Sequence, residues 1–197
     1  MDNQLTESEF KKIKCEIMKA SDLSLKGSID EQILSLIEKI NSHEDFVTTS
    51  SCSGRTVVLS KDDDQKAGCK WVYTSHCKVD ENEFLESILK ESGNLVVKFE
   101  PFILHVQCRT LKRAKFMLTC ALESGCKNSG FTLGKNGKIT VAVRSTLNLE
   151  VPISFMGQLL VDEKYLNFLV SKANQKMEKN QENILKFDNL FSRLFNK

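Results

Sequence analysis

The sequence lacks the features that mark membrane-spanning, secreted and low-complexity proteins. Its 197 residues include only two prolines and nine glycines, which argues against a long disordered linker or arm. No apolar run approaches the roughly 20 residues that a membrane span requires, and the opening residues Met1 to Phe10 are polar and acidic, unlike a secretory signal. We therefore expect a cytoplasmic protein without membrane association. It is expected to form one domain over residues 1–197, with a core at about 21–161 and a C-terminal helix at about 162–195.

The sequence also lacks a disulfide framework, a zinc motif and the common nucleotide fingerprints. Its seven cysteines form an odd set without paired spacing, so we expect reduced thiols. There is no C-x-x-C, and the three histidines lie far apart in sequence, which predicts no metal site. No dinucleotide glycine fingerprint, P-loop or serine-hydrolase elbow is present. An enzyme with this sequence therefore needs a fold outside the doubly wound families.

A basic segment between Pro101 and Leu149 is the strongest positive feature. It holds eight lysines and arginines against a single acidic residue, Glu123, whereas the whole chain has a net charge of only +2. Clustered cations release counterions from phosphates, so the segment indicates a polyanionic partner. It is also dense in serine, asparagine and glycine, which favours a polar pocket in the same place. The basic residues are Arg109, Lys112, Arg113, Lys115, Lys127, Lys135, Lys138 and Arg144.

Hydrophobic periodicity predicts an α+β fold, with helices packed on a mainly antiparallel or mixed sheet that is not of the Rossmann type. Helices are expected at residues 5–20, 28–42, 83–92, 110–123 and 162–195. Strands are expected at residues 46–51, 55–60, 70–76, 95–100, 102–109, 131–133, 139–145 and 158–161. A helix followed by a Ser-Gly turn and a valine-rich strand occurs twice, at 28–59 and 110–143, which leaves an internal duplication open.

Capping residues and apolar stripes define the helices. Ser28 and Glu31 match a capping box ahead of the second helix, Thr110 is placed to cap the fourth, and Asp162 to cap the last. The apolar stripe of the last helix is expected to comprise Tyr165, Phe168, Leu169, Ala173, Met177, Ile184, Phe187 and Leu190.

Turn residues and alternation define the strands. Asn136-Gly137 predicts a hairpin, and we interpret Cys52-Ser53-Gly54 as a second hairpin turn. Pro101 is expected to mark a bend, an edge or a bulge between two strands, because proline removes a ladder hydrogen bond. Alternation along residues 70–76 places Trp71 and Tyr73 on one face.

The segment from Thr48 to Arg55 is the first candidate site, because four hydroxyl residues precede a glycine and an arginine. Such a turn can offer hydroxyls and backbone N–H groups to a carboxylate, a phosphate or a base edge, and Gly54 allows close backbone approach. An ordinary polar hairpin turn is the alternative.

The strand at 102–109 is the second candidate, because alternation gives it one polar face that includes His105 and Arg109. His105 is suited to accept a proton or stack on a base, or it is simply satisfied by hydrogen bonds. Glu100, just before Pro101, is suited to bond an amino group or to pair with an arginine.

The third candidate combines Asn128-Ser129-Gly130 with Arg144 at the end of an apolar strand. A planar guanidinium there can bind a phosphate or a carboxylate through two hydrogen bonds. A surface arginine without a ligand is the alternative.

These clusters together resemble a known family. The ordered motifs are SDLSLKGSID, TTSSCSGR, KFEPFILHVQCR, SGCKNSGFTLGKNGKITVAVRST, LEVP and ANQKMEKN. Over residues 21–180 this set resembles the wybutosine-synthesis methyltransferases. The resemblance implies an S-adenosylmethionine-dependent enzyme with a fold unlike the Rossmann methyltransferases. It further implies methylation of the N-4 ring nitrogen of a tricyclic, guanine-derived base next to the anticodon of phenylalanine tRNA, a step in making wybutosine.

The resemblance places a site on the matching motifs, within which we infer roles from chemistry. The candidate proton acceptors are Asp22, Glu100 and His105. Residues expected to bind S-adenosylmethionine are Ser51, Ser53, Gly54, Arg55, Asn128, Ser129, Gly130, Arg144 and Ser145. Residues expected to contact tRNA are Lys26, Arg109, Lys112, Arg113, Lys115, Lys135 and Lys138. A non-catalytic RNA-binding module is the alternative function, and we expect a monomer, although the last helix could instead pair two copies.

Overall fold

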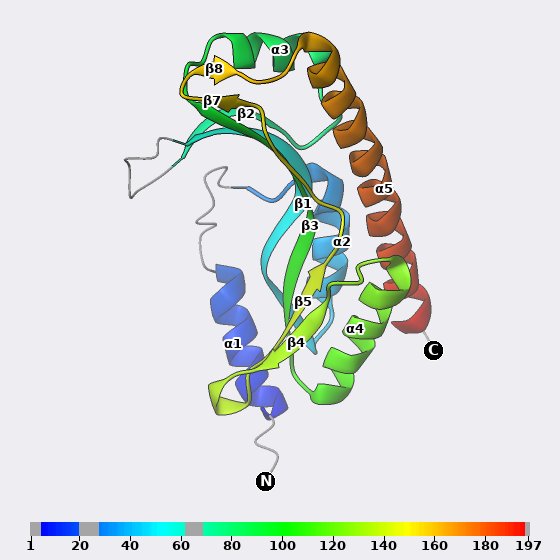
Figure 1. The fold of residues 1–197 in the computed structure, drawn as a ribbon. Helices are drawn as coiled ribbons and strands as arrows, with labels where there is room; N and C mark the ends of the chain where they lie inside the picture. The colour runs from blue at the N-terminus through cyan, green and yellow to red at the C-terminus, as the bar shows by residue number, and fades with distance from the viewer. Residues whose placement is uncertain (1–4, 20–27, 62–68, 196–197) are drawn as a thin grey trace. The chain divides into compact units, whose positions relative to one another are not determined.

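The structure is a computed structural model that describes residues 5–19, 28–61 and 69–195 (Figure 1). The chain divides into two compact units. The first unit comprises Met1–Ser53, Phe102–Thr146 and Glu182–Lys197, and the second comprises Gly54–Pro101 and Leu147–Gln181. The elements that contribute residues to both units are β1 (Phe46–Lys61), β3 (Asn94–Cys108) and α5 (Glu163–Phe195). Helices combined with antiparallel strands confirm the predicted α+β class.

The first unit packs helices against its strands around one core. The strand order there is β1-β3-β5-β4, and β5 pairs antiparallel with both β3 and β4. Its other elements are α1 (Glu7–Lys19), α2 (Glu31–Ser42), α4 (Leu111–Ser124), β4 (Gly130–Leu133), the 3-10 helix η1 (Lys135–Gly137) and β5 (Ile139–Arg144). The core includes Ile33, Ile37, Ile40, Leu104, Val106, Met117, Val141, Val143 and Phe187. Alternation along β3 and β5 therefore leaves His105 and Ala142 on the face away from this core.

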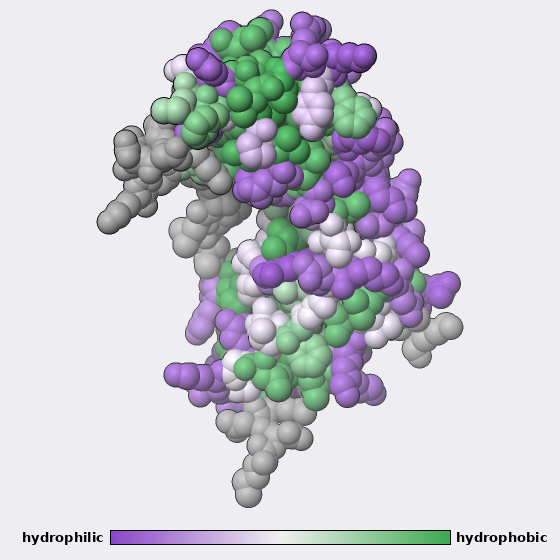
Figure 2. Space-filling model, in the orientation of Figure 1, coloured by the Kyte–Doolittle hydropathy of each residue, from purple (hydrophilic) through white to green (hydrophobic). Residues whose placement is uncertain are grey.

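The second unit has a core of its own. In it β1 pairs antiparallel with β2, and β3 with β6. Its other elements are β2 (Lys70–Ser75), α3 (Glu81–Leu89), β6 (Leu149–Pro152), β7 (Ser154–Phe155) and β8 (Gln158–Leu159). The core comprises Val58, Val79, Phe84, Ile88, Leu95, Val97, Ile153, Leu166, Leu169 and Val170. Exposed apolar side chains gather over the β7–β8 hairpin, green at the top of Figure 2; they include Phe155, Met156, Leu159 and Leu160.

Several locally determined features match the prediction. The Thr110 hydroxyl accepts a hydrogen bond from the Arg113 N–H at 3.3 Å, so it caps α4. The Asp162 carboxylate accepts from the Tyr165 N–H at 2.8 Å at the start of α5. Asn136 has a φ of 57° and Gly137 one of 73° between β4 and β5, as the Asn-Gly hairpin signal requires. All seven cysteines are free thiols.

The predicted hairpin at Cys52-Ser53-Gly54 is wrong, because β1 continues through it as one strand of 16 residues. Gly54 has a φ of 100°, a conformation that adjusts a strand locally without reversing it. The two Ser-Gly pairs of the proposed repeat therefore lie in different settings: Ser53-Gly54 inside β1, and Ser129-Gly130 at the start of β4.

The division into two strands at Pro101 is also wrong, because β3 is one strand from Asn94 to Cys108. β6 pairs with residues 96–99 of this strand and β5 pairs with residues 103–108. Pro101 lies between the two stretches, so its missing N–H removes a hydrogen bond from neither ladder.

Two predictions about helices need correction. The capping box at Ser28 is wrong, since α2 begins at Glu31 with Asp30 as its N-cap. In α5, Tyr165 and Phe168 are substantially exposed, and Leu166 and Val170 are buried in their place. The buried stripe is thus offset from the one that hydrophobicity alone selected. Among the described residues, no helix combines the length and the apolarity that crossing a bilayer requires.

Candidate functional site

A hollow of about 760 Å³ lies in the first unit over β3, β5 and β4. His105, Ala142 and Gly130 stand opposite one another across the three strands, so they share one face of the sheet. Gly130 carries no side chain, and no atom lies within 4 Å of the point where a Cβ would be. Small residues on two strands thus leave an open floor between larger polar walls. The lining residues are His105, Asn128, Ser129, Gly130, Phe131, Thr132, Gly134, Lys138, Thr140, Ala142 and Arg144.

His105 is held at both ring nitrogens. Its Nδ1 lies 2.7 Å from the Ser50 hydroxyl oxygen, and its Nε2 lies 3.1 Å from Nη2 of Arg144. A guanidinium can only donate, so Nε2 must be the unprotonated acceptor and Nδ1 must carry the hydrogen that Ser50 accepts. Burial, and then the nearby Arg144 charge, lower the pKa of His105. The ring is therefore neutral at neutral pH, with its accepting nitrogen already used by Arg144.

The backbone of Arg144 is fixed by the Asn128-Ser129 turn. The Arg144 N–H donates to the Ser129 hydroxyl at 2.9 Å, and the Asn128 N–H donates to the Arg144 carbonyl at 3.0 Å. The Ser129 hydroxyl in turn donates to the Cys126 carbonyl at 2.7 Å. The side chain of Arg144 is nevertheless exposed, so a rigid backbone presents a guanidinium to the hollow.

The part of β1 that belongs to the first unit is a strand and not the expected turn. The buried Ser53 donates its N–H to a carboxylate oxygen of Asp30 at 2.8 Å. Asp30 is itself buried, and sequence reasoning missed it. Its position just before an apolar helix was the available signal, because aspartate is a favoured N-cap.

Gly54, Arg55 and Glu100 belong to the second unit. The Arg55 Nε donates to a Glu100 carboxylate oxygen at 2.7 Å, so Glu100 pairs with an arginine, one of the two predicted alternatives. Asp22 and Lys26 lie outside the described residues.

Two of the predicted RNA-binding arginines have an internal partner. Arg109 and Arg113 both donate their Nε to the carboxylate of Asp45, with 2.6 Å between Arg113 and Asp45, and that carboxylate has no exposed surface. Burial acts to raise the pKa of Asp45, but hydrogen bonds from both arginines outweigh it and leave the pKa below its ordinary value. By contrast, the lysines of the basic segment are exposed: Lys112, Lys115, Lys127, Lys135 and Lys138.

The buried thiols are poor nucleophiles. Burial raises the pKa of Cys108 to about 12 and that of Cys120 to about 11, and the thiolate is the reactive form.

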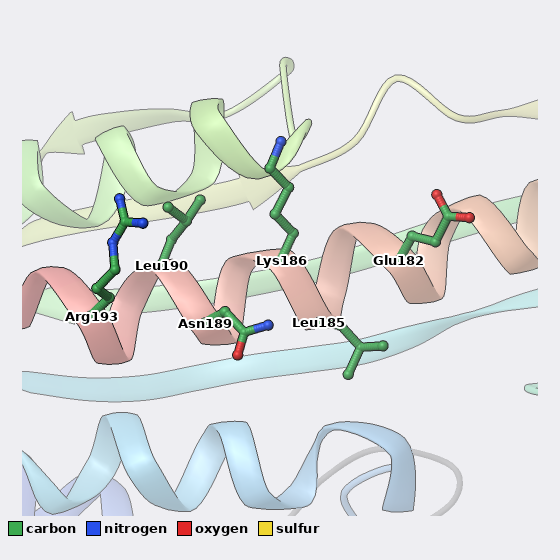
Figure 3. A pocket seen from close by; sticks show the side chains of 6 residues that line it. All are labelled: Glu182, Leu185, Lys186, Asn189, Leu190 and Arg193. Atoms are coloured by element: carbon green, nitrogen blue, oxygen red, sulfur yellow. The ribbon is translucent and has the colours of Figure 1, made fainter.

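A second hollow of about 500 Å³ lies along α5 (Figure 3). All its lining residues belong to this one helix: Glu182, Leu185, Lys186, Asn189, Leu190 and Arg193. Lys186 and Arg193 point to one side of the helix in Figure 3, whereas Leu185 and Asn189 point to the other. Polar groups do not converge here, and none of the predicted site residues is present. The hollow over β3, β5 and β4 is therefore the better candidate for a ligand site.

The match to a family decides between the chemistries that such a hollow allows. The model of the family described as methyltransferase TYW3 matches residues 8–193. The chain belongs to the methyltransferase TYW3 family. Curated relatives named tRNA wybutosine-synthesizing protein 3 homolog include one from Bos taurus, 44% identical over 91% of this chain and 71% of its own length. The human relative of that name is 44% identical over 92% of this chain and 72% of its own length.

A solved structure extends the family likeness to three dimensions. The PH1069 protein from Pyrococcus horikoshii is 35% identical, with a TM-score of 0.85, over 93% of this chain and 96% of that one. An Arabidopsis thaliana protein named tRNA wybutosine-synthesizing protein 2/3/4 is 37% identical over 82% of this chain, which spans only 18% of that protein. The sequence is thus matched over nearly the full length of one solved chain and over a small part of a much longer protein.

Proposed function

We propose that this methyltransferase of wybutosine biosynthesis transfers the methyl group of S-adenosylmethionine to the N-4 ring nitrogen of the tricyclic precursor in phenylalanine tRNA. We further propose that the hollow in the first unit holds the amino acid end of the donor. The observation that carries this proposal is the exposed guanidinium of Arg144, fixed by His105 and by the Asn128-Ser129 turn. The protein would act as a cytoplasmic monomer, as the sequence led us to expect.

Arg144 suits the carboxylate of the donor. Only Nη2 is used by His105, and because that partner is neutral it leaves the positive charge uncompensated. Charge-assisted pairs between arginine and carboxylate are among the stronger hydrogen bonds in proteins. The hydroxyls of Thr132 and Thr140 line the same hollow and are suited to polar groups of the ligand. A volume of about 760 Å³ also falls within the roughly 300–1,000 Å³ of typical small-molecule sites.

The reaction mainly requires that the reacting atoms be held in line. The lone pair of N-4 attacks the methyl carbon, the carbon–sulfur bond breaks with its electrons moving to sulfur, and S-adenosylhomocysteine leaves. Holding the reacting atoms in line supplies most of the rate for a step of this kind. Any proton on N-4 must leave to water or to another base, because Nε2 of His105 already accepts from Arg144. His105 is accordingly a positioning residue for Arg144 in this proposal, and Glu100 is engaged by Arg55.

The exposed lysines suit the RNA backbone. Four lysines of the basic segment have exposed side chains: Lys112, Lys115, Lys135 and Lys138. Contacts to phosphate place an RNA without reading its sequence. The choice of target base must then come from the site that receives it.

Calorimetric binding of S-adenosylhomocysteine tests the proposal, together with methyl transfer to phenylalanine tRNA that carries the unmethylated precursor. Loss of a charge-assisted pair in Arg144→Ala should weaken donor binding roughly 10- to 150-fold. Arg193→Ala is the matched control, since that exposed arginine lies on α5, and it should bind as the wild type does. Unchanged donor binding in Arg144→Ala would show that the hollow is not the donor site. A protein that binds tRNA but never the donor would instead be the RNA-binding module.

A further inference from the structure

The only tryptophan of the chain, Trp71, is turned away from the core of the second unit by an irregularity in β2. Val58 stands opposite Tyr73 and Leu59 stands opposite Trp71, so Val72 is an extra residue between two paired positions. This bulge puts Tyr73 toward the core, where its ring meets Phe84 at 5.6 Å. The expectation that Trp71 and Tyr73 share a face is therefore wrong, because a bulge breaks the alternation.

Trp71 joins a row of side chains on the face of the second unit away from its core. The Arg55 guanidinium carbon lies 4.5 Å from the centre of the indole ring. The Arg55 Nε also donates to Glu100 at 2.7 Å, which fixes the guanidinium plane. Three neighbouring strands, β2, β1 and β3, thus contribute an indole, a guanidinium and a carboxylate in turn. We call Trp71, Arg55 and Glu100 the indole row.

We propose that the indole row is a binding site, called the ring seat below, for a planar purine-type ring of a substrate. This inference rests on the proposed function, which supplies two such rings: the adenine of the methyl donor and the guanine-derived target base of the RNA. Both have the same chemistry, an extended π face with hydrogen-bonding edges. The row matches it with an aromatic face, the N–H groups of a guanidinium, and a carboxylate that accepts from ring N–H or amino groups.

Burial of apolar surface alone does not explain this arrangement. The Trp71 side chain is 40% exposed, although a large aromatic ring contributes most when it is buried. Its neighbours Val72 and Tyr73 pack, partly buried, against the core, whereas the indole does not. Bulges recur beside active sites, where they redirect a side chain, and exposed aromatic and arginine planes are the surfaces on which unpaired bases stack.

Intrinsic fluorescence tests the proposal directly, because Trp71 is the only tryptophan. We would titrate the full chain with S-adenosylhomocysteine, and separately with an anticodon stem-loop of phenylalanine tRNA that carries the unmethylated precursor. Free N-acetyltryptophanamide corrects for absorption by each ligand. Saturable quenching by the first ligand would assign the seat to adenine, and quenching by the second alone would assign it to the target base.

Calorimetry on variants supplies the second measurement. Removing one stacking partner in Trp71→Ala should weaken the ligand that quenches by roughly 5- to 150-fold, and Trp71→Phe should recover part of that loss. Tyr165→Ala is the matched control, since Tyr165 is an aromatic residue of the same unit with the same 40% exposure, and it should bind normally. Ligands that bind by calorimetry without quenching, and equally well in Trp71→Ala, would overturn the ring seat and leave the proposed function intact. No calorimetric binding of either ligand would overturn both.

Discussion

At the junction of β3 and α4, Arg109 and Arg113 share the buried carboxylate of Asp45, whereas Arg144 on β5 is held by the neutral ring of His105. All three arginines come from the same basic segment of the sequence. In the first place the positive charge is compensated inside the protein, and in the second it is left for a ligand. The partner of an arginine, more than its place in a basic run, decides whether its charge serves the fold or a substrate.

The largest expected effect comes from removing the shared carboxylate. Asp45→Asn leaves two arginines without their counter-charge. We expect unfolding free energy to fall by about 2–3 kcal/mol, somewhat less than for a fully buried pair because the arginines are partly exposed. Urea unfolding measures this, and Glu123→Gln, an exposed carboxylate on α4, should change stability little. A loss as small as that of the control would show that Asp45 is not what anchors the junction.

Removing the neutral partner should affect ligand binding more than stability. His105→Ala leaves Arg144 in place but without its acceptor, and the loss of one positioning hydrogen bond should cost about 1 kcal/mol, or roughly fivefold in donor affinity. His105→Gln offers an amide oxygen as a substitute acceptor and should recover part of that loss. Calorimetry with S-adenosylhomocysteine compares the two variants, and equal affinity in both would remove His105 from the positioning of Arg144.

Acidification should weaken the contact between His105 and Arg144. Because the pKa of His105 is lowered in the folded protein, the folded state resists protonation at a pH where the unfolded chain accepts it. Donor affinity should be constant above pH 6.5, the ordinary value of histidine, and should fall as pH drops through the lowered pKa. In His105→Gln this acid limb should be absent. A limb of the same size in that variant would mean that another group titrates.

The smallest expected effect is a difference between two neighbouring residues on α4, Lys112 and Arg113. Lys112→Ala removes an exposed charge and should lower the salt dependence of tRNA binding by about one phosphate contact, with no change in stability. Arg113→Ala removes a partner of Asp45. It should lower stability and leave the salt dependence of tRNA binding unchanged. Filter binding at several salt concentrations, together with urea unfolding, gives both quantities. Equal effects of the two variants would erase the distinction between compensated and free charge.

Features set by near neighbours in sequence could be predicted, and those set by distant partners could not. Thr110 as a cap and Asn136-Gly137 as a hairpin are local choices, and both are present. The continuity of β1 through Gly54 depends on its long-range pairing, which sequence alone does not reveal.

The same limit applies to the site. The sequence placed His105, Ser129 and Arg144 among the candidates, and the structure brings them together around one hollow. It could not show that Asp45 lies against Arg109, because 64 residues separate the two in the chain. Counting charge along the basic segment therefore overstated what is available to an RNA.

The long helix α5 gives each unit residues that its core requires. The core of the second unit includes Val170, and that of the first includes Phe187 and Phe191. Neither core is complete while the ribosome is still making the strands. Apolar strand surface therefore stays exposed until α5 has been synthesised. Nascent chains with exposed apolar strands are prone to aggregate. Both cores should therefore form only after α5 has been synthesised.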